Sequence, residues 1–241
     1  HAPSRPLRQV HLMGDPIECV PHDKHLGVLI GGVPNDEVIR LAISDFNKRV
    51  GMLRVHYKWL APDCLYNLFK SFCMPLYGSV LWDFSHRSVD RFYTAWRKGI
   101  RLLLGLHPRT HCALLAPICN DCDADIQLLS RFVKFLRSLS RSRNRVVQAC
   151  FPLAMDGSRS SVSRSISVAC ARARQPRSTL IESRCNPRSL FPQNDAHDQK
   201  GGLVKDMLLM KSEIKLQAHY DPQQRELIEN INFIITELCT E

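Results

Sequence analysis

Two cysteines and their neighbours are the side chains whose types and spacing most readily suggest chemistry. Cys119 and Cys122 form a C-x-x-C pair, and His111 and Cys112 lie a few residues upstream. A structural zinc ion is bound by four Cys or His side chains in a tetrahedron, which makes these four residues candidate ligands. The sequence contains no second C-x-x-C pair, and two adjacent residues rarely bind one ion comfortably. We therefore favour ordinary loop thiols over zinc, and also over a redox site, because no βαβ pattern surrounds the pair.

Patterns typical of other catalytic centres are missing from the sequence. There is no G-x-S-x-G nucleophile motif, and Gly31-Gly32 lacks the spacing of a phosphate-binding loop. Helix capping explains the alternating carboxylates Asp121, Asp123 and Asp125 without a metal ion. The sequence therefore predicts no catalytic residue, no metal ligand and no bound cofactor.

Basic side chains interleaved with aromatic residues on predicted helices are the strongest functional signal. Arg97 and Arg101 stand four residues apart, as do Arg137 and Arg141, so each pair lies on one helix face. Such a surface would contact the phosphates of RNA or DNA without reading the base sequence. The alternative is a solvated helix surface with no partner, and the sequence leaves both interpretations open. The candidate nucleic-acid-binding residues are Lys58, Lys70, Arg91, Arg97, Lys98, Arg101, Arg131, Lys134, Arg137 and Arg141.

The charge of the chain indicates an acidic partner. The 241 residues carry a formal net charge of +10. Nucleic acid is the partner that we favour, and an anionic membrane surface comes second. Residues 131–188 contain thirteen Arg or Lys and two acidic residues, so this segment accounts for the whole excess.

The sequence also bears on the compartment of the protein. The N-terminal residues HAPSRPLRQV lack the apolar core of a signal peptide, and no apolar run approaches the roughly 20 residues of a membrane helix. The ten cysteines are scattered without framework spacing, which is typical of reduced thiols. We therefore expect a protein of the nucleus or cytoplasm that is neither secreted nor embedded in a membrane.

Hydrophobic spacing predicts a mainly α fold with a short β element near the N-terminus. In residues 1–34, five prolines exclude a long helix, and the apolar run Leu26–Ile30 suits a strand that pairs with Ile17–Val20. In residues 35–155, apolar side chains recur at helical spacing. The expected helices are Asp36–Tyr57 with Asn35 as N-cap, a helix from Pro62 to the break at Pro75, a helix capped by Ser85 that ends near Leu106, a helix capped by Asp123, and Val146–Ala154.

Composition changes twice towards the C-terminus. Residues 156–200 are rich in Ser and Arg and poor in large apolar side chains, so we expect a linker that is largely disordered in isolation. This linker is either passive or orders on RNA or DNA. Residues 201–241 are net acidic and show two amphipathic stripes, with Asp221 and Pro222 as a helix start, which predicts an αα-hairpin.

Four stretches resemble the C-terminal part of the reverse transcriptases that non-LTR (LINE-type) retrotransposons encode. They are HLGVLI (25–30), LYNLFKSFCMPLYGSVLW (65–82), AWRKGIRLLLGLHPRTHCALL (95–115) and LSRFVKFLRSL (129–139). The resemblance covers roughly residues 15–160 and rests on the order and spacing of these motifs. It implies that an "LG" strand closes the palm of the polymerase and that a helical thumb-like domain follows and grips the template–primer duplex.

The same resemblance limits the activity that we expect. In that family, RNA-directed DNA polymerase chemistry uses Mg²⁺-binding aspartates in a Phe/Tyr-Ala-Asp-Asp strand upstream of the "LG" element, and no such strand occurs in this sequence. The chain therefore resembles a fragment that begins just before the end of the palm and is inactive alone. A cysteine–histidine knuckle found in some relatives is approached here only by Cys119 and Cys122.

Two further hypotheses belong to different classes. The acidic hairpin 201–241 would dock a protein partner if the chain is a non-catalytic helical interaction module. The sequence is also consistent with a non-functional transposon relic whose product does not fold.

Overall fold

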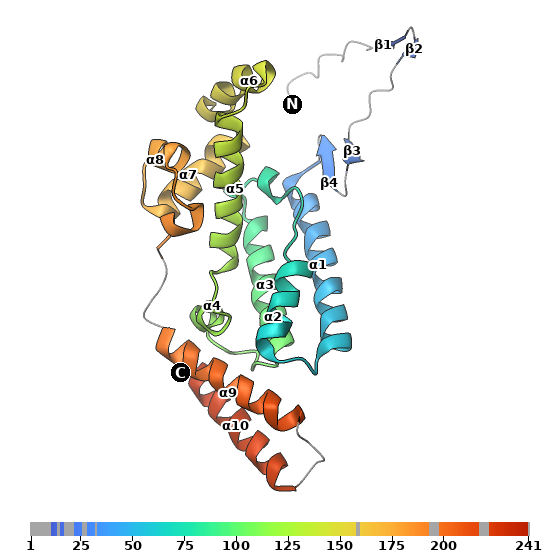
Figure 1. The fold of residues 1–241 in the computed structure, drawn as a ribbon. Coiled ribbons are helices and arrows are strands. Elements are labelled where there is room, and N and C mark those ends of the chain that lie inside the picture. Colours follow the sequence, from blue (N-terminus) through green and yellow to red (C-terminus); the bar gives the residue numbers. More distant parts are fainter. Residues whose placement is uncertain are drawn as a thin grey trace.

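The computed structural model confirms a mainly α fold. It describes residues 11–13, 15–16, 22–25, 28–31, 33–157, 160–192, 198–216 and 222–240. In Figure 1, a bundle of helices occupies the centre, short strands lie at one side of it, and the last two helices lie at one end. None of the helices in the described part combines the length and the apolar character that a membrane crossing requires.

Short β elements lie near the N-terminus, as the sequence predicts. β3 (His22–His25) pairs antiparallel with β4 (Val28–Gly31), and Asp23 lies opposite Ile30. A second pair joins β1 (His11–Leu12) to β2 (Asp15–Pro16). The strand predicted within the run 26–30 is thus present as β4. Its expected partner at 17–20 and the dipeptide at 26–27 lie outside the described residues.

The first helices form the packing centre of the bundle. α1 (Asn35–Tyr57) lies beside α3 (Ser88–Leu104), and α2 (Pro62–Phe72) begins at the predicted proline. The close approach of α1 to α3 needs a glycine, because a Cβ at Gly99 would lie 3.1 Å from the ring of Phe46. The buried aromatic side chains of this centre include Phe46, Phe69, Trp82, Phe92 and Trp96.

Two of the predicted helix caps are wrong. Asn35 is the first residue of α1, and its amide donates to Ser88 Oγ at 3.1 Å and accepts from the Asp83 N–H at 3.1 Å. Ser85 lies before α3 and donates its hydroxyl to Asp83 Oδ1 at 2.6 Å. Asn35 thus satisfies a backbone N–H of the loop that precedes α3, and Ser85 binds a carboxylate of the same loop. Neither side chain is left to cap a helix. α3 consequently begins two residues later than a cap at Ser85 predicts, and it ends at Leu104, where Gly105 follows with a φ of +64°.

A 3-10 turn, η1 (Ser79–Leu81), lies between α2 and α3, and four further elements follow α3 before residue 157. A second turn, η2 (Cys112–Leu114), leads into the short α4 (Leu115–Ile118) within a stretch expected to be a loop. α5 (Ala124–Ser140) begins after Asp123, and α6 (Arg145–Asp156) matches the predicted short helix. α5 contacts η1 and α3 as well as α6 and elements that follow α6, so it connects the two halves of the chain.

The expectation of a disordered linker over 156–200 is wrong for its described residues. α7 (Ser161–Ala173), α8 (Arg177–Glu182) and η3 (Pro187–Leu190) fold against α5. α7 buries a narrow stripe of small side chains, and α8 and η3 add buried apolar anchors. The buried side chains of the segment are Ser165, Ile166, Ala169, Ala173, Leu180 and Phe191. The composition of the segment does not reveal this stripe, because one Ile and two Ala side chains are enough to fill the contact between closely packed helices.

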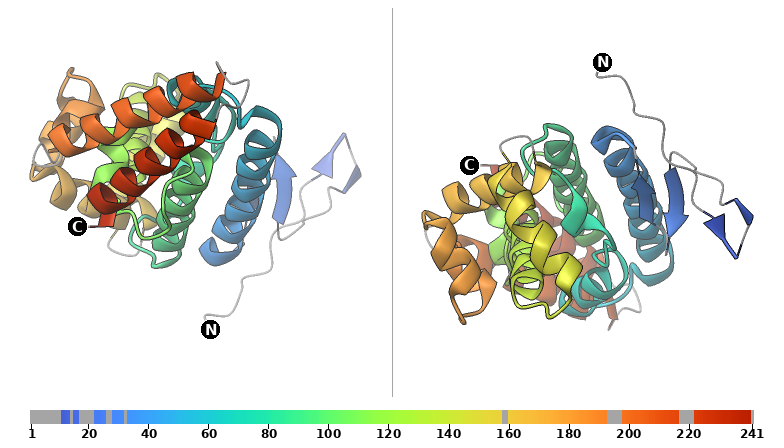
Figure 2. Two further views of the ribbon diagram at one scale, coloured as in Figure 1. Left: turned by 90° about the horizontal axis from the view of Figure 1, so that it is seen from below. Right: turned by 90° about the horizontal axis from the view of Figure 1, so that it is seen from above.

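The predicted C-terminal hairpin is present. α9 (Asp198–Leu216) and α10 (Pro222–Thr240) lie side by side, and Figure 2 shows them crossing the end of the bundle. α9 packs closely on α4, where a Cβ at Gly201 would lie 2.3 Å from Pro117 Cβ. The His111 N–H donates to the Cys239 carbonyl at 2.8 Å, so α10 is also attached to the body. The predicted cap at position 221 lies outside the described residues.

Candidate nucleic-acid interface

Arg137 is a predicted phosphate ligand that the structure places in the interior. Its side chain is buried on α5, where Nε donates to the Leu180 carbonyl at 2.8 Å and Nη1 donates to the Cys185 carbonyl at 2.6 Å. These carbonyls belong to α8 and to the chain that follows it. Arg137 therefore joins the Ser/Arg-rich segment to α5, and its charge is turned away from solvent.

Two more predicted ligands are bound to backbone carbonyls. Arg131 donates to the Met74 carbonyl at 2.6 Å. Arg101 donates to the Thr110 carbonyl through Nε at 3.0 Å and through Nη2 at 2.6 Å. A guanidinium has several donors in one plane, so it can hold a loop that lacks regular backbone pairing. Both arginines thus close loops onto helices.

Lys70 is held by a buried carboxylate. Lys70 Nζ lies 2.7 Å from Asp121 Oδ2, Arg188 Nη1 lies 3.3 Å from Asp121 Oδ1, and the Tyr66 hydroxyl donates to Asp121 at 3.2 Å. Burial alone would raise the pKa of the Asp121 carboxyl, but hydrogen bonds from Lys70 and the Cys122 N–H, with the two nearby cations, hold that pKa below its usual range. We call Lys70, Arg101, Arg131 and Arg137 the interior cations.

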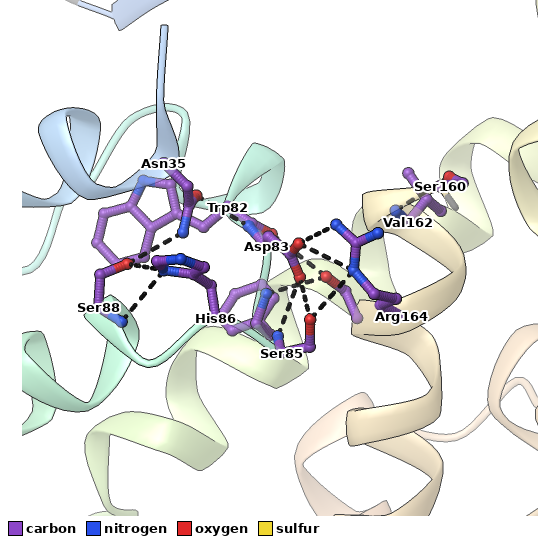
Figure 3. A network of polar contacts seen from close by, with 11 residues as sticks. Asn35, Trp82, Asp83, Ser85, His86, Ser88, Ser160, Val162 and Arg164 are labelled. Carbon is purple, nitrogen blue, oxygen red and sulfur yellow. Dashed lines mark hydrogen bonds and ion pairs between the residues drawn. The ribbon is translucent and has the colours of Figure 1, made fainter. Parts of the chain in front are cut away.

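Arginines of α7 are also paired within the fold. Arg164 forms an ion pair with Asp83 and donates to Ser85, as Figure 3 shows. Arg172 Nε lies 2.8 Å from Asp125 Oδ2 on α5. The positive charge of the Ser/Arg-rich segment is thus partly neutralised by carboxylates far away in the sequence. This pairing explains how such a basic segment can pack.

A group of exposed cations lies where α5 meets α6. Lys134 is exposed on α5, Arg141 and Arg143 are exposed in the turn that follows this helix, and Arg145 is exposed at the start of α6. No hydrogen bond or ion pair joins these four side chains to other described residues. No Asp or Glu occurs between Asp125 and Asp156 in the sequence. We call Lys134, Arg141, Arg143 and Arg145 the α5–α6 corner.

Local sequence explains why this corner forms. α5 ends at Ser140, and the Asn144 side chain accepts the N–H groups of Val146 at 2.9 Å and Val147 at 3.4 Å, which caps α6. The connection between the helices is therefore a short turn rather than a loose loop. Arg141 and Arg143 are presented on this turn, and Arg145 is the first residue of α6.

The remaining predicted residues do not join this cluster. Arg91 and Lys98 are exposed on α3, and Arg91 Nη1 lies 3.9 Å from Asp36. Arg97 is half-buried near Asp123, whose pKa is raised mainly by burial. Lys58 follows α1 at the end of the bundle opposite to α6 (Figure 1). The candidate residues named from the sequence thus lie in separate places on the fold.

Sequence reasoning missed Arg143 and Arg145. Both lie in a run of 30 residues, 126–155, that contains no acidic side chain. Such a run offers no nearby carboxylate to its cations, although Arg131 and Arg137 in the same run bind backbone carbonyls instead. Helical spacing selects the arginines of α5 whether their side chains face the interior or the solvent.

The cysteine pair lies in the interior. Cys119 and Cys122 are buried, and burial raises the pKa of both thiols above the ordinary value. Arg101 Nη2 lies 3.2 Å from Cys112 Sγ. Within the described ranges, no group of three or more His, Cys, Asp or Glu side chains lies close enough to hold a metal ion.

A pocket of about 1080 Å³ lies beside this pair. The loop before α5, the end of α7, η3 and the start of α9 line it. Three of its cations, Arg172, Arg188 and Lys205, are paired with Asp125, Asp121 and Asp63 respectively. Its charge is therefore mostly used within the fold, and the α5–α6 corner remains the better candidate for an acidic ligand.

Comparison of the chain with protein-family models, with curated protein sequences and with solved structures found no match. The functional assignment consequently rests on the residues and geometry described above.

Proposed function

We propose that this protein binds the phosphate backbone of nucleic acid through the α5–α6 corner. The observation that carries the proposal is the group of four exposed cations, Lys134, Arg141, Arg143 and Arg145, which have no carboxylate within their own 30-residue run. Each phosphate that such a side chain neutralises releases a condensed counterion. Binding is therefore driven by counterion release and is independent of base sequence.

The proposal also includes the class of protein to which this binding activity belongs. The resemblance described above favours a thumb-like part of a LINE-type, RNA-directed DNA polymerase, in which the helices hold the template–primer duplex. Catalysis is outside the proposed role of this chain, since its sequence contains no Phe/Tyr-Ala-Asp-Asp strand. Mg²⁺ would belong to a palm domain that carries such aspartates. A reverse transcriptase of this kind works in the nucleus or cytoplasm, which is where we place this chain.

Salt titration of duplex binding tests the proposal. We expect a labelled RNA–DNA duplex to bind the full chain with an affinity that falls by a slope of about 0.9 in log K per log salt for each phosphate contacted. Replacing Arg141, Arg143 and Arg145 together with Ala removes three such contacts, so the slope should fall by about three. Fluorescence anisotropy at several salt concentrations measures both quantities.

Two exposed cations on α1 provide the control. Arg40 and Lys48 are already close to Glu37 and Asp45, at 3.9 and 3.7 Å, so the double alanine variant should keep the wild-type slope. The proposal fails if duplex binding is undetectable or indifferent to salt. It also fails if both variants lower the slope equally, because then the position of the cations does not matter.

A second candidate function is a protein-interaction module built on the α9–α10 hairpin. The observation that favours it is a set of large apolar side chains that stay exposed on these helices: Leu203, Met210, Leu227, Phe233 and Ile234. A Phe233→Glu variant of the full chain should then lose a co-purifying protein partner while keeping salt-dependent duplex binding. A Phe233→Glu variant that keeps both the protein partner and duplex binding would contradict the hairpin as the docking surface.

A further inference from the structure

An aromatic and basic surface lies at the end of α1, away from the α5–α6 corner. It consists of Arg54, His56, Tyr57, Lys58 and Trp59, which are all exposed, and we call it the α1–α2 corner. Trp59 is 60% exposed and Tyr57 is 41% exposed. The exposed Met52 and Val55 precede these residues on the same helix.

Exposure of Trp59 contrasts with the other tryptophans of the chain. Trp82 and Trp96 are 4% and 1% exposed, as expected for large apolar rings. The Trp59 ring is nevertheless held in place, because Nε1 donates to the His56 carbonyl at 3.0 Å. This bond leaves the faces of the indole available while restricting its motion. Little ordering entropy would then be lost when a flat ligand stacks on it.

The charge around Trp59 favours an anionic ligand. Residues 46–62 contain Lys48, Arg49, Arg54 and Lys58 and no acidic residue. Lys48 and Arg49 have partners within the fold, Asp45 and the Phe72 carbonyl. Arg54 and Lys58 make no hydrogen bond or ion pair with other described residues. Two exposed cations therefore flank two exposed aromatic rings.

We infer that the α1–α2 corner binds single-stranded nucleic acid, with bases stacked on Trp59 and Tyr57 and phosphates beside Arg54 and Lys58. Proteins that bind single strands without sequence preference combine these two features, because every base has a flat face and every link carries a negative charge. A base in a duplex has its faces covered by neighbours, so stacking on Trp59 selects unpaired nucleotides. The inference rests on the proposed function, since both require nucleic acid as the partner.

The two corners lie at opposite ends of the bundle (Figure 1). A ligand at the α1–α2 corner therefore need not compete with a duplex at the α5–α6 corner. We expect variants of one corner to leave binding at the other unchanged. This independence allows the two proposals to be tested apart.

Fluorescence provides a direct test, because Trp59 is the tryptophan that solvent and ligands can reach. Adding dT15 to the full chain should quench its emission, and Trp59→Ala should weaken dT15 binding by about tenfold in anisotropy. Trp59→Phe should keep most of the affinity, since phenylalanine also offers a flat face. Tyr77→Ala is the matched control, because this ring is 79% exposed elsewhere on the surface.

Each outcome decides between the proposals. If Trp59→Ala binds dT15 as the wild type does while blunt duplex binding remains dependent on salt, stacking is wrong and the proposed function stands. If neither ligand binds, both are wrong. If vesicles of phosphatidylserine quench Trp59 and dT15 does not, the surface with Met52 and Val55 is a membrane contact and the inference is overturned. Loss of dT15 binding alone in Trp59→Ala supports it.

Discussion

Two neighbouring regions of α5 use the same residue type in opposite ways. At the contact with α8, Arg137 is buried and its donors bind the Leu180 and Cys185 carbonyls. One turn further on, at the α5–α6 corner, Arg141 is exposed with no described partner. The difference teaches that net charge is a poor measure of binding surface, because the fold uses some cations to join its own segments. Only the remaining cations can bind an external anion.

Replacing Arg137 with Ala is expected to have the largest effect on this comparison. Two charge-assisted hydrogen bonds disappear and buried carbonyls lose their donors, which should cost about 3 kcal/mol in the free energy of unfolding. Urea denaturation followed by circular dichroism measures this change. Arg141→Ala is the matched control and should stay within about 0.5 kcal/mol of the wild type. Equal stabilities for the two variants would remove the distinction between the regions.

Acid should weaken the contacts that the buried Asp121 carboxylate makes with Lys70 and Arg188. The pKa of Asp121 is lowered in the folded protein, so its contribution is fully present above the unfolded pKa of about 3.9 and is lost as pH falls below that value. Asp121→Asn should cost about 1–2 kcal/mol at pH 7, because Lys70 and Arg188 lose their shared carboxylate.

The pH dependence distinguishes this carboxylate from a general effect of acid. The Asp121→Asn variant should lose less stability than the wild type between pH 5 and pH 2 in urea titrations, since the titrating group is gone. Parallel curves for the two proteins would mean that Asp121 does not carry the linkage.

A smaller effect is expected at an uncharged position of the same interior. Ser165 is fully buried on α7, accepts the Phe84 N–H at 3.0 Å and donates to the Trp82 carbonyl at 3.4 Å. Ser165→Ala leaves that N–H without its acceptor and should cost about 1 kcal/mol. Ser167→Ala is a control, because this hydroxyl is exposed on the same helix. If both substitutions are neutral in thermal unfolding, α7 contributes no more to the fold than a linker would.

Much of the helical architecture could be predicted from apolar spacing. The start of α2 at Pro62, the length of α1 and the presence of the final hairpin follow from residues that are close in sequence. The caps at Asn35 and Ser85 were mistaken because these side chains bind residues of the loop before α3, some of them far away in the chain. α7 was missed for a similar reason, since its Arg164 is paired with a carboxylate 81 residues earlier.

The candidate interface was only partly accessible to sequence reasoning. Helical spacing places Arg137 and Arg141 on one face, but that face runs from the buried contact with α8 onto the open surface. No local sequence pattern shows where the segment that covers Arg137 ends. The exposure of Trp59 depends on which segments pack beside the end of α1. Such information is tertiary, so it appears only in the folded structure.

The glycine at position 201 gives the C-terminal hairpin an unusual dependence on the smallest side chain. α9 reaches α4 at a point where an added methyl group would overlap the ring of Pro117. The attachment of the hairpin to the body therefore depends on a position that a single added carbon atom would obstruct.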